Sequence, residues 1–289
     1  MHITSMKSLI LIFLRGLAMG MADIIPGVSG GTIALITGIY ERLIFAIRGL
    51  SMGFLKKLLK GDAKGAAADI KTMDLEFLAA LFAGIITSFL VLSGVIRFFM
   101  NVYPSNTYAF FFGLILASAV FVRRHVERIN WKTAASGISG LVFAILLVGS
   151  GTLQSSHIPA VIFFSGFIAI CAMILPGISG AFILFFLGQY EYMLNALHSL
   201  DVFNISVFST GAVLGLLTMS RVLGYLLKNH KAATMSFLVG LMLGALRMPY
   251  ENIVTTSFVL PFVMLSAISG FILVVMLEKL SGESGSNSS

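Results

Sequence analysis

The chain has 289 residues, of which 58% are apolar and only 11% are charged, and its mean hydropathy is +1.00. Because soluble domains carry about 25% charged residues, this composition excludes an ordinary soluble domain and predicts an all-α polytopic membrane protein. The net charge of +7 does not indicate a nucleic-acid partner, since the basic residues lie between apolar segments, as membrane-topology signals do. The single Cys171 excludes a disulfide framework.

Two short apolar runs open the chain, residues 9–25 and 32–47. Each reaches only about 25 Å as a helix, against a hydrocarbon core of about 30 Å. A helix-breaking stretch joins them, Asp23-Ile24-Ile25-Pro26-Gly27-Val28-Ser29-Gly30-Gly31-Thr32. Proline ends a helix and glycine permits tight turns. Backbone groups freed inside a membrane must be buried in protein or line a cavity, so we expect the break to have a structural or binding role.

Six further apolar segments and a second broken segment follow along the chain. The tail, residues 281–289, is rich in Gly, Ser and Asn and is expected to be disordered. The predicted spans are 75–98, 107–122 and 133–153 before the second broken segment at 158–199, and 202–227, 232–248 and 257–277 after it.

The positions of Lys and Arg predict the topology. The loops 48–73, 123–132 and 228–231 carry Lys and Arg. The other loops carry none, namely 99–106, 154–157, 198–201 and 249–256. We take the side with the basic loops as cytoplasmic. Loops with and without Lys or Arg then fall on opposite sides in turn only if each broken segment begins and ends on one side of the membrane. For 8–47 that side is the cytoplasm, and for 158–199 it is the outside. Each broken segment is therefore predicted to be a helical hairpin, and both termini to be cytoplasmic. The short arms favour re-entrant hairpins, and two thin full spans are the alternative.

The two broken segments are copies of one another at a shift of 150 residues, with eleven identities between 22–46 and 172–196. A weaker similarity links Phe112-Gly113-Leu114-Ile115-Leu116-Ala117 to Val239-Gly240-Leu241-Met242-Leu243-Gly244. Residues 1–153 and 154–280 are thus predicted to be two repeats, each with a re-entrant hairpin and three transmembrane helices. Three is odd, so the second repeat is inverted, an architecture typical of secondary transporters.

Both breaks have the composition of an anion-binding site. A helix is predicted to begin after each of them, and its first N–H groups lack intrahelical partners and favour negative charge. We therefore expect a phosphate or carboxylate ligand, and the alternative is a tight turn whose small residues allow close helix packing. The candidate residues are Pro26, Gly27, Ser29, Gly30, Gly31, Thr32, Pro176, Gly177, Ser179 and Gly180.

Charged residues inside apolar segments are costly and usually functional. Arg221, Arg97 and Arg15 could pair with a phosphate, although Arg97 could instead extend to the membrane interface. A carboxylate partly removed from water holds a proton more readily, so Asp23, Glu41 and Glu191 could couple transport to a proton or sodium gradient. The alternative for Glu41 is a salt bridge with Arg15 or Arg42. The histidines show no metal-ligand spacing, so we expect neither a metal site nor a cofactor.

The stretches Gly20-Met21-Ala22-Asp23-Ile24-Ile25-Pro26-Gly27-Val28-Ser29-Gly30-Gly31-Thr32 and Met173-Ile174-Leu175-Pro176-Gly177-Ile178-Ser179-Gly180-Ala181 resemble the signatures of the bacterial polyprenyl-phosphate transporter family. The resemblance covers nearly the whole chain. It implies a flippase that moves undecaprenyl phosphate from the outer to the inner leaflet of the cytoplasmic membrane, which recycles the carrier lipid for peptidoglycan and other envelope polymers. The polyprenyl tail follows from this resemblance alone.

The sequence leaves other classes of protein to be compared. A channel or secondary transporter for a small anion could use the same helix-end site, and would need a continuous aqueous path rather than a lateral opening to lipid. A lipid phosphatase would need an activated nucleophile or a metal, and neither break contains a histidine. We therefore expect a transporter and not an enzyme, with a lipid substrate and no nucleic-acid partner. The oligomeric state, the coupling ion, the net direction of flux and the preferred prenyl length stay open.

Overall fold

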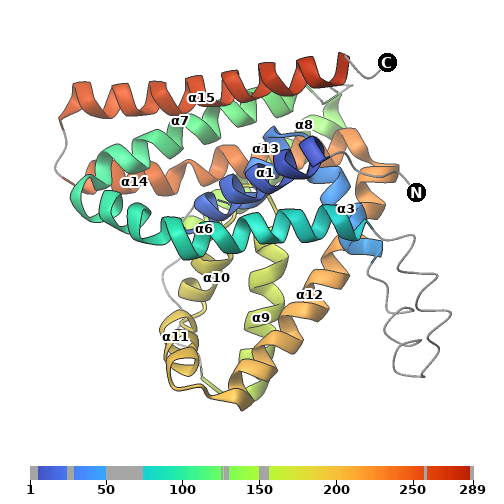
Figure 1. Cartoon of the computed structure of the whole chain (residues 1–289), viewed down its shortest axis with the longest axis vertical. Coiled ribbons are helices and arrows are strands. Elements are labelled where there is room, and N and C mark those ends of the chain that lie inside the picture. The colour runs from blue at the N-terminus through green and yellow to red at the C-terminus, as the bar shows by residue number, and fades with distance from the viewer. Residues whose placement is uncertain are drawn as a thin grey trace.

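The computed structural model describes residues 6–24, 29–49, 74–124, 126, 130–149, 156–256 and 259–286, and the regular elements in these ranges are all helices (Figure 1). The first half contains α1 (Met6–Ile24), α2 (Gly30–Ile36), α3 (Tyr40–Gly49), α6 (Leu75–Val102), α7 (Pro104–Arg123) and α8 (Trp131–Gly149). The second half contains α9 (Pro159–Ile174), α10 (Gly180–Phe186), α11 (Tyr190–His198), α12 (Val202–Asn229), α13 (Lys231–Ala245), α14 (Arg247–Thr255) and α15 (Leu260–Ser286).

Several of these helices can cross a membrane. Five segments in the described ranges are long and apolar enough, namely α6, α7, α8, α12 and the continuous run α13–α14. The helices α9 and α15 supply shorter apolar stretches. Large apolar side chains such as Leu90 and Leu146 are exposed on the outside, at 78% and 65%, which suits contact with lipid. The chain is therefore a membrane protein.

Local sequence signals account for where several helices begin and end. Pro104 and Pro159 stand in the first turns of α7 and α9, where a missing N–H costs nothing. Gly38 and Gly188 follow the short helices α2 and α10 with φ of 72° and 65°. The residue after each glycine donates its N–H five residues back, Ile39 to Ala34 and Gln189 to Leu184, as in a Schellman motif. The repeated glycine thus ends the helix in both halves.

The helix boundaries differ from the sequence-based expectation in three places. Each broken segment contains three helices rather than two arms, and α2 and α3 are bent by 116° because the Gly38 turn reverses the chain. The run expected at 232–248 continues as α14 to Thr255. The helix α15 continues to Ser286, into the tail that was expected to be disordered, and residues 287–289 of that tail lie outside the described ranges.

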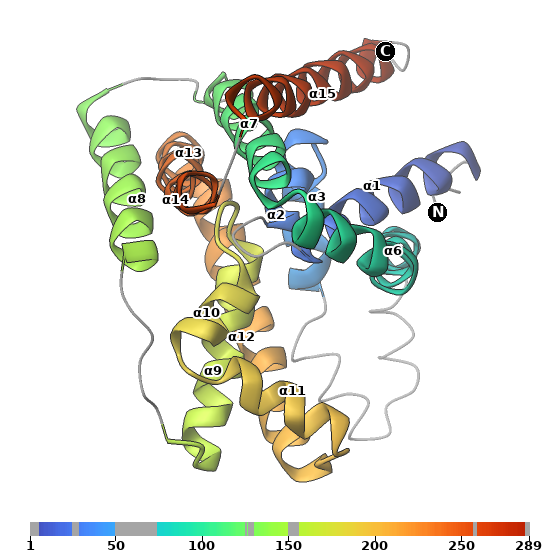
Figure 2. The ribbon, with the colours of Figure 1, turned by 90° about the vertical axis from the view of Figure 1, so that its left-hand side faces the viewer.

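The helices pair in a reciprocal pattern between the halves. Within each half the arm before the break packs against the first long helix, α1 on α6 and α9 on α12. The remaining long helices exchange partners, since α7 packs against α15 and α8 against α13 (Figures 1 and 2). The expected repeats therefore interleave in space rather than forming two separate bodies.

Glycines mark these contacts at equivalent positions. A Cβ at Gly84 would collide with the Phe13 carbonyl, and one at Gly211 with the Phe163 carbonyl. Gly84 and Gly211 lie 127 residues apart, whereas Phe13 and Phe163 lie 150 apart, as in the repeat. Small residues let helix backbones approach closely inside membranes, so α1–α6 and α9–α12 use the same contact.

The exchanged pairs, α7–α15 and α8–α13, also approach closely at equivalent glycines, although the sequence similarity between these parts of the two halves is weak. Gly113 and Gly240, also 127 residues apart, approach backbone carbonyls of α15 and α8, those of Ala267 and Gly137. These two carbonyls lie in the similar stretches Ser136-Gly137-Ile138-Ser139-Gly140 and Ser266-Ala267-Ile268-Ser269-Gly270. Equivalent segments of the two halves thus make equivalent contacts.

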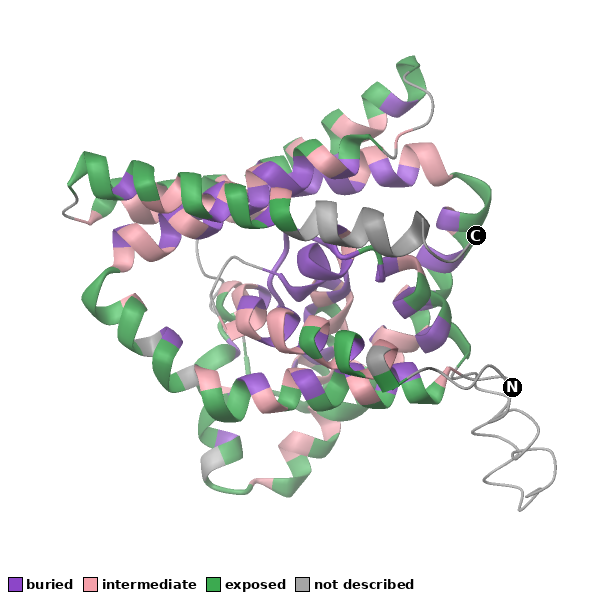
Figure 3. Ribbon diagram, turned by 45° about the horizontal axis from the view of Figure 1, so that its top comes forward, coloured by how far each residue is buried: buried purple, intermediate pink, exposed green. Residues whose placement is uncertain are grey.

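The buried core lies where the first break meets the body of the molecule. Buried residues, purple in Figure 3, gather at the centre of the molecule. One large cluster joins all the described helices except α11 and α14, whereas Ile162, Met193 and Ala196 form a small separate cluster around α11. The first hairpin is therefore part of the main core, and α11 is not.

Candidate functional site

The first break is held by Ser29, which precedes α2 and is fully buried. Its hydroxyl accepts the N–H of Gly31 at 3.1 Å and donates to the carbonyl of Leu175 at 3.3 Å. Leu175 belongs to the second break. One side chain therefore caps the helix after the first break and ties that break to the second one.

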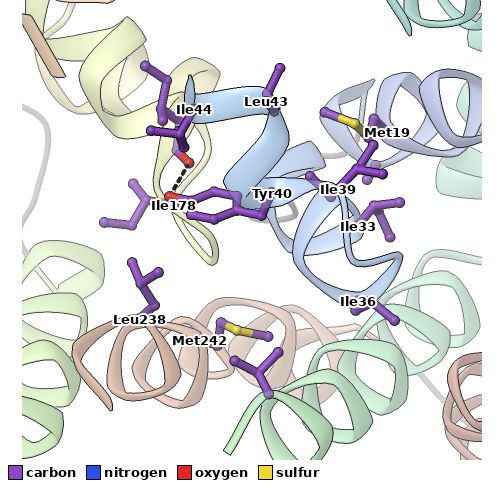
Figure 4. Close-up of a cluster of buried hydrophobic side chains, with 14 of the residues drawn as sticks. Met19, Ile33, Ile36, Ile39, Tyr40, Leu43, Ile44, Ile178, Leu238 and Met242 are labelled. Carbon is purple, nitrogen blue, oxygen red and sulfur yellow. Dashed lines mark hydrogen bonds between the residues drawn. The ribbon is translucent and has the colours of Figure 1, made fainter. Parts of the chain in front are cut away.

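Two further hydrogen bonds join the breaks. The N–H of Gly177 donates to the hydroxyl of Thr32 at 3.0 Å. The hydroxyl of Tyr40, at the start of α3, donates to the carbonyl of Ile174 at 3.2 Å, along the dashed line that leaves Tyr40 in Figure 4. The carbonyl at the end of α9, which has no partner within its helix, is thereby satisfied by the opposite half. The two breaks meet at the centre of the fold.

The first break already holds an acidic side chain of its own. A carboxylate oxygen of Asp23 accepts the N–H of Gly30 at 2.7 Å, and the N–H of Gly31 bonds to Ser29. The amides that the sequence offered to an external anion at the start of α2 are therefore paired within the chain. Pro26 and Gly27 lie outside the described residues.

The second break differs at the equivalent positions. Met173 stands where the first half has Asp23, and Ser179, which precedes α10, makes no side-chain capping bond. Gly177 has φ of 86°, a conformation that suits glycine, and it approaches the backbone of Met242 in α13. The second break thus lacks the internal carboxylate of the first.

A cavity of about 630 Å³ lies beside the two breaks. Its polar lining comes from Asp23 at the end of the first arm, from Ser179 and Gly180 in the second break and from Tyr190 at the start of α11. The remaining lining is mostly apolar and comes from four helices and the end of α1: Phe89, Ile96 and Met100 of α6; Gly166, Ala169, Ile170 and Met173 of α9; Ala181 and Leu184 of α10; Phe208 and Ala212 of α12; and Ile24. The cavity therefore has a small polar region and long apolar walls.

Two of the three candidate arginines lie away from the cavity that Ser179 and Gly180 line. Arg15 is half-buried in α1 and Arg221 is exposed on α12, and neither lines the cavity. Arg97 lies in α6 between the lining residues Ile96 and Met100, but its side chain is outside what the structure describes. The structure thus brings Asp23, Ser179 and Gly180 together, and leaves Arg15 and Arg221 apart from them.

The two glutamates of the repeated motif have different surroundings. The carboxylate of Glu41 forms an ion pair with Lys231 at 2.7 Å, which joins α3 to the start of α13. This partner is neither Arg15 nor Arg42, and Arg42 instead pairs with Asp74 at 2.6 Å. Glu191 is exposed on α11. Neither glutamate lines the cavity.

Sequence reasoning missed the tyrosines of the same motif. Tyr40 is 2% exposed and bonds to the second break, whereas Tyr190 is 38% exposed and lines the cavity. The repetition of the tyrosines was visible in the sequence. The adjacent glutamates were chosen as candidates instead, because a charge inside a membrane is costly. His157, which the sequence did not single out, stacks on Tyr192 with ring centroids 4.1 Å apart, and its Nδ1 lies 3.1 Å from Gln189 Oε1.

Comparison with known proteins identifies the family. Residues 19–260 match the family model described as undecaprenyl phosphate translocase-like. The chain belongs to this family. It is 43% identical over 236 residues to a polyprenyl-phosphate transporter of Vibrio cholerae serotype O1, covering 81% of this chain and 75% of the relative. It is also 28% identical to a polyprenyl-phosphate transporter of Staphylococcus aureus, covering 93% of this chain and 96% of that relative. No solved structure matches the chain.

The region shared with the undecaprenyl phosphate translocase-like family contains the site. The matched residues run from the last turns of α1 to the first residue of α15. They include both breaks, the bonds of Ser29, Thr32 and Tyr40 between them, and the lining of the cavity. The resemblance noted in the sequence is therefore confirmed at the level of the family.

Proposed function

We propose that this protein carries a polyprenyl phosphate across the membrane, with the phosphate at the polar region of the cavity and the prenyl chain along its apolar walls. The lining of the cavity carries this proposal. Ser179 and Gly180 supply hydroxyl and amide groups, and Phe89, Met100 and Phe208 of α6 and α12 supply apolar surface. A cavity of this size suits a head group and the start of a chain, and the rest of a long tail would lie in lipid.

The position of the cavity along these helices supports an inward direction of transport. Met100 is near the end of α6 and Phe208 near the beginning of α12, next to the loops that carry neither Lys nor Arg. By the positive-inside rule this is the outer side. We infer that the protein takes the substrate from the outer leaflet of the bacterial cytoplasmic membrane and delivers it to the inner leaflet, where it serves envelope synthesis again.

An inverted repeat would give this transport a structural basis. Equivalent glycines make equivalent contacts in α1–α6 and α9–α12, and the later helices exchange partners between the halves. Two halves of opposite orientation, each with a broken re-entrant hairpin, would present one central site to the two sides of the membrane in turn. Arg97, whose backbone lies between two cavity residues, is retained as a candidate phosphate ligand in this scheme.

Reconstitution tests the substrate site. The full chain is placed in liposomes with a fluorescent polyprenyl phosphate, and its movement between leaflets is followed with a quencher. Replacing Ser179 with alanine should slow movement about tenfold or more, because a hydrogen bond to a charged group contributes about 1.5–3 kcal/mol. The matched control is Ser118→Ala, since Ser118 is buried in α7 and bonds only within its helix. Equal rates for the two variants would contradict the site.

The same vesicles separate the competing functions. A small-anion transporter would take up inorganic phosphate without a prenyl chain, and a lipid phosphatase would release inorganic phosphate from the substrate. We expect neither. Uptake of free phosphate at the rate of the lipid would favour the small-anion alternative instead.

Asp23 is the best-placed candidate for gradient coupling, because it lines the cavity and bonds to the first break. Asp23→Asn keeps an oxygen acceptor for the N–H of Gly30 and removes the charge. We expect this variant to transport without stimulation by an imposed proton or sodium gradient. The control is Glu191→Gln, which changes an exposed carboxylate outside the cavity. Stimulation that persists in Asp23→Asn would rule out this residue.

A further inference from the structure

The first hairpin is locked onto the opposite half at the basic end of the molecule. The helix α3 packs against α12, and Glu41 pairs with Lys231. A Cβ at Gly224 of α12 would lie 3.0 Å from Cδ of Arg48. Together with the bond from Tyr40 to the Ile174 carbonyl, these contacts close this end of the molecule.

The second hairpin lacks the equivalent contacts. The counterpart of the α3–α12 pair would be α11 on α6, but α11 packs mainly against α12 and α10 of its own half. The cavity lies in this place, between Ile96 and Met100 of α6 and Tyr190 of α11. One end of the molecule is therefore closed by a hairpin, and the other end is open beside the equivalent hairpin.

The repeat specifies the missing contact. Tyr190 corresponds to Tyr40 and Ile24 to Ile174, each pair 150 residues apart. Tyr190 and Ile24 both line the cavity, and within the described residues the Tyr190 hydroxyl makes no hydrogen bond. A buried hydroxyl and an end-of-helix carbonyl gain most from pairing when water is excluded.

We propose that α10 and α11 form a gate that closes over the cavity, and that Tyr190 is its latch, donating to the carbonyl of Ile24 as Tyr40 donates to that of Ile174. The proposal rests on the proposed transport function and adds a residue to it. We infer that the two gates close in alternation, because a site whose second gate is closed can release its ligand only when the first gate opens. Tyr40 and Tyr190 then stabilise opposite states of one cycle.

Cross-linking in liposomes tests the latch in a Cys171→Ser background. The pair R48C and G224C reports the closed α3 gate, because these positions are in contact here. The equivalent pair H198C and R97C reports a closed α11 gate. We expect a short bifunctional thiol reagent to link each pair, and linking the first pair to prevent linking of the second when all four cysteines are present. A second pair that never links, while the first does, would overturn the gate.

The tyrosine variants then separate the latch from the gate. Tyr190→Phe should lower linking of the second pair by about threefold to tenfold, the change expected for one ordinary hydrogen bond, and should not reduce linking of the first pair. Tyr40→Phe should do the reverse. Unchanged linking in Tyr190→Phe would overturn the latch. Transport itself is measured on the protein without introduced cysteines, because R97C removes a candidate phosphate ligand. Cross-links that exchange as expected, together with no movement of polyprenyl phosphate by that unsubstituted protein, would contradict the transport proposal and leave the gate standing.

Discussion

The two hairpins share a sequence motif but differ in their packing. In α2 six of the seven residues are buried, whereas in α10 only Gly180 and Ile183 are. The arm α3 joins the main hydrophobic cluster, while α11 contributes Met193 and Ala196 to a small one. Because both hairpins end their short helix with the same glycine turn, the local fold is the same. The difference therefore lies in how each hairpin docks, which is what a molecule with one gate closed and one open would show.

The residues that break the symmetry fit this difference. A Cβ at Gly31 would lie 3.0 Å from the Ile174 carbonyl and 3.4 Å from the Pro176 nitrogen, so the docked break favours glycine there. The second break has Ala181 at this position, and Ala181 lines the cavity. Asp23 caps the docked break, and Met173 replaces it in the other. Docking thus favours a glycine at position 31 and an acidic residue at position 23 of the first break. The second break has neither at the equivalent positions.

The largest expected effect comes from the arms of the hairpins. Ile44 in α3 is fully buried, whereas the equivalent Leu194 in α11 is 40% exposed. Ile44→Ala should cost about 2–5 kcal/mol of stability because it leaves a cavity in a packed core, and Leu194→Ala should cost less than about 1 kcal/mol. Thermal unfolding of the purified protein in detergent measures both. Equal losses would mean that the two arms dock alike.

A smaller effect is expected at the serines of the breaks. Ser29→Ala removes both hydrogen bonds of a buried side chain and should destabilise the protein by about 1–3 kcal/mol. Ser179→Ala should leave the unfolding midpoint nearly unchanged while it slows transport, since Ser179 caps nothing. The comparison sharpens if stability and transport rate are measured on the same preparations. A Ser179→Ala protein as unstable as Ser29→Ala would show that the second break is also docked.

The smallest effect belongs to the glutamates. The ion pair of Glu41 with Lys231 is partly exposed, so Glu41→Gln should cost only about 0.2–1 kcal/mol, and less at high salt. Glu191→Gln, at the equivalent exposed position, should change stability still less. A double-mutant cycle with Lys231→Gln gives the pair energy directly. A coupling energy of zero at low salt would remove this contact from the closed gate.

The sequence predicted the membrane-crossing class and the places where helices break, because Pro, Gly and apolar length act locally. It could not show that α7 pairs with α15 and α8 with α13, since each helix has an apolar surface that would suit several partners. The sequence could not place the charges. Arg221 is exposed on α12, and Glu41 forms a salt bridge, the alternative left open for it, but with the distant Lys231. The partner of a charged side chain depends on tertiary packing, which no local pattern shows. The tyrosines were overlooked because one hydroxyl contributes little until its partner is known.

The exchange of partners between α7, α8, α13 and α15 also bears on how the chain is made. Helix α8 packs mainly against α13, which is synthesised about a hundred residues later, and α7 packs mainly against α15, at the end of the chain. During synthesis α7 and α8 must therefore wait in the bilayer without their final neighbours. Contacts between distant segments form late and slowly, so assembly can finish only after α15 has left the ribosome. A ribosome that stalls before α15 would leave a membrane-inserted chain with an unpaired helix, a form that quality-control proteases could recognise.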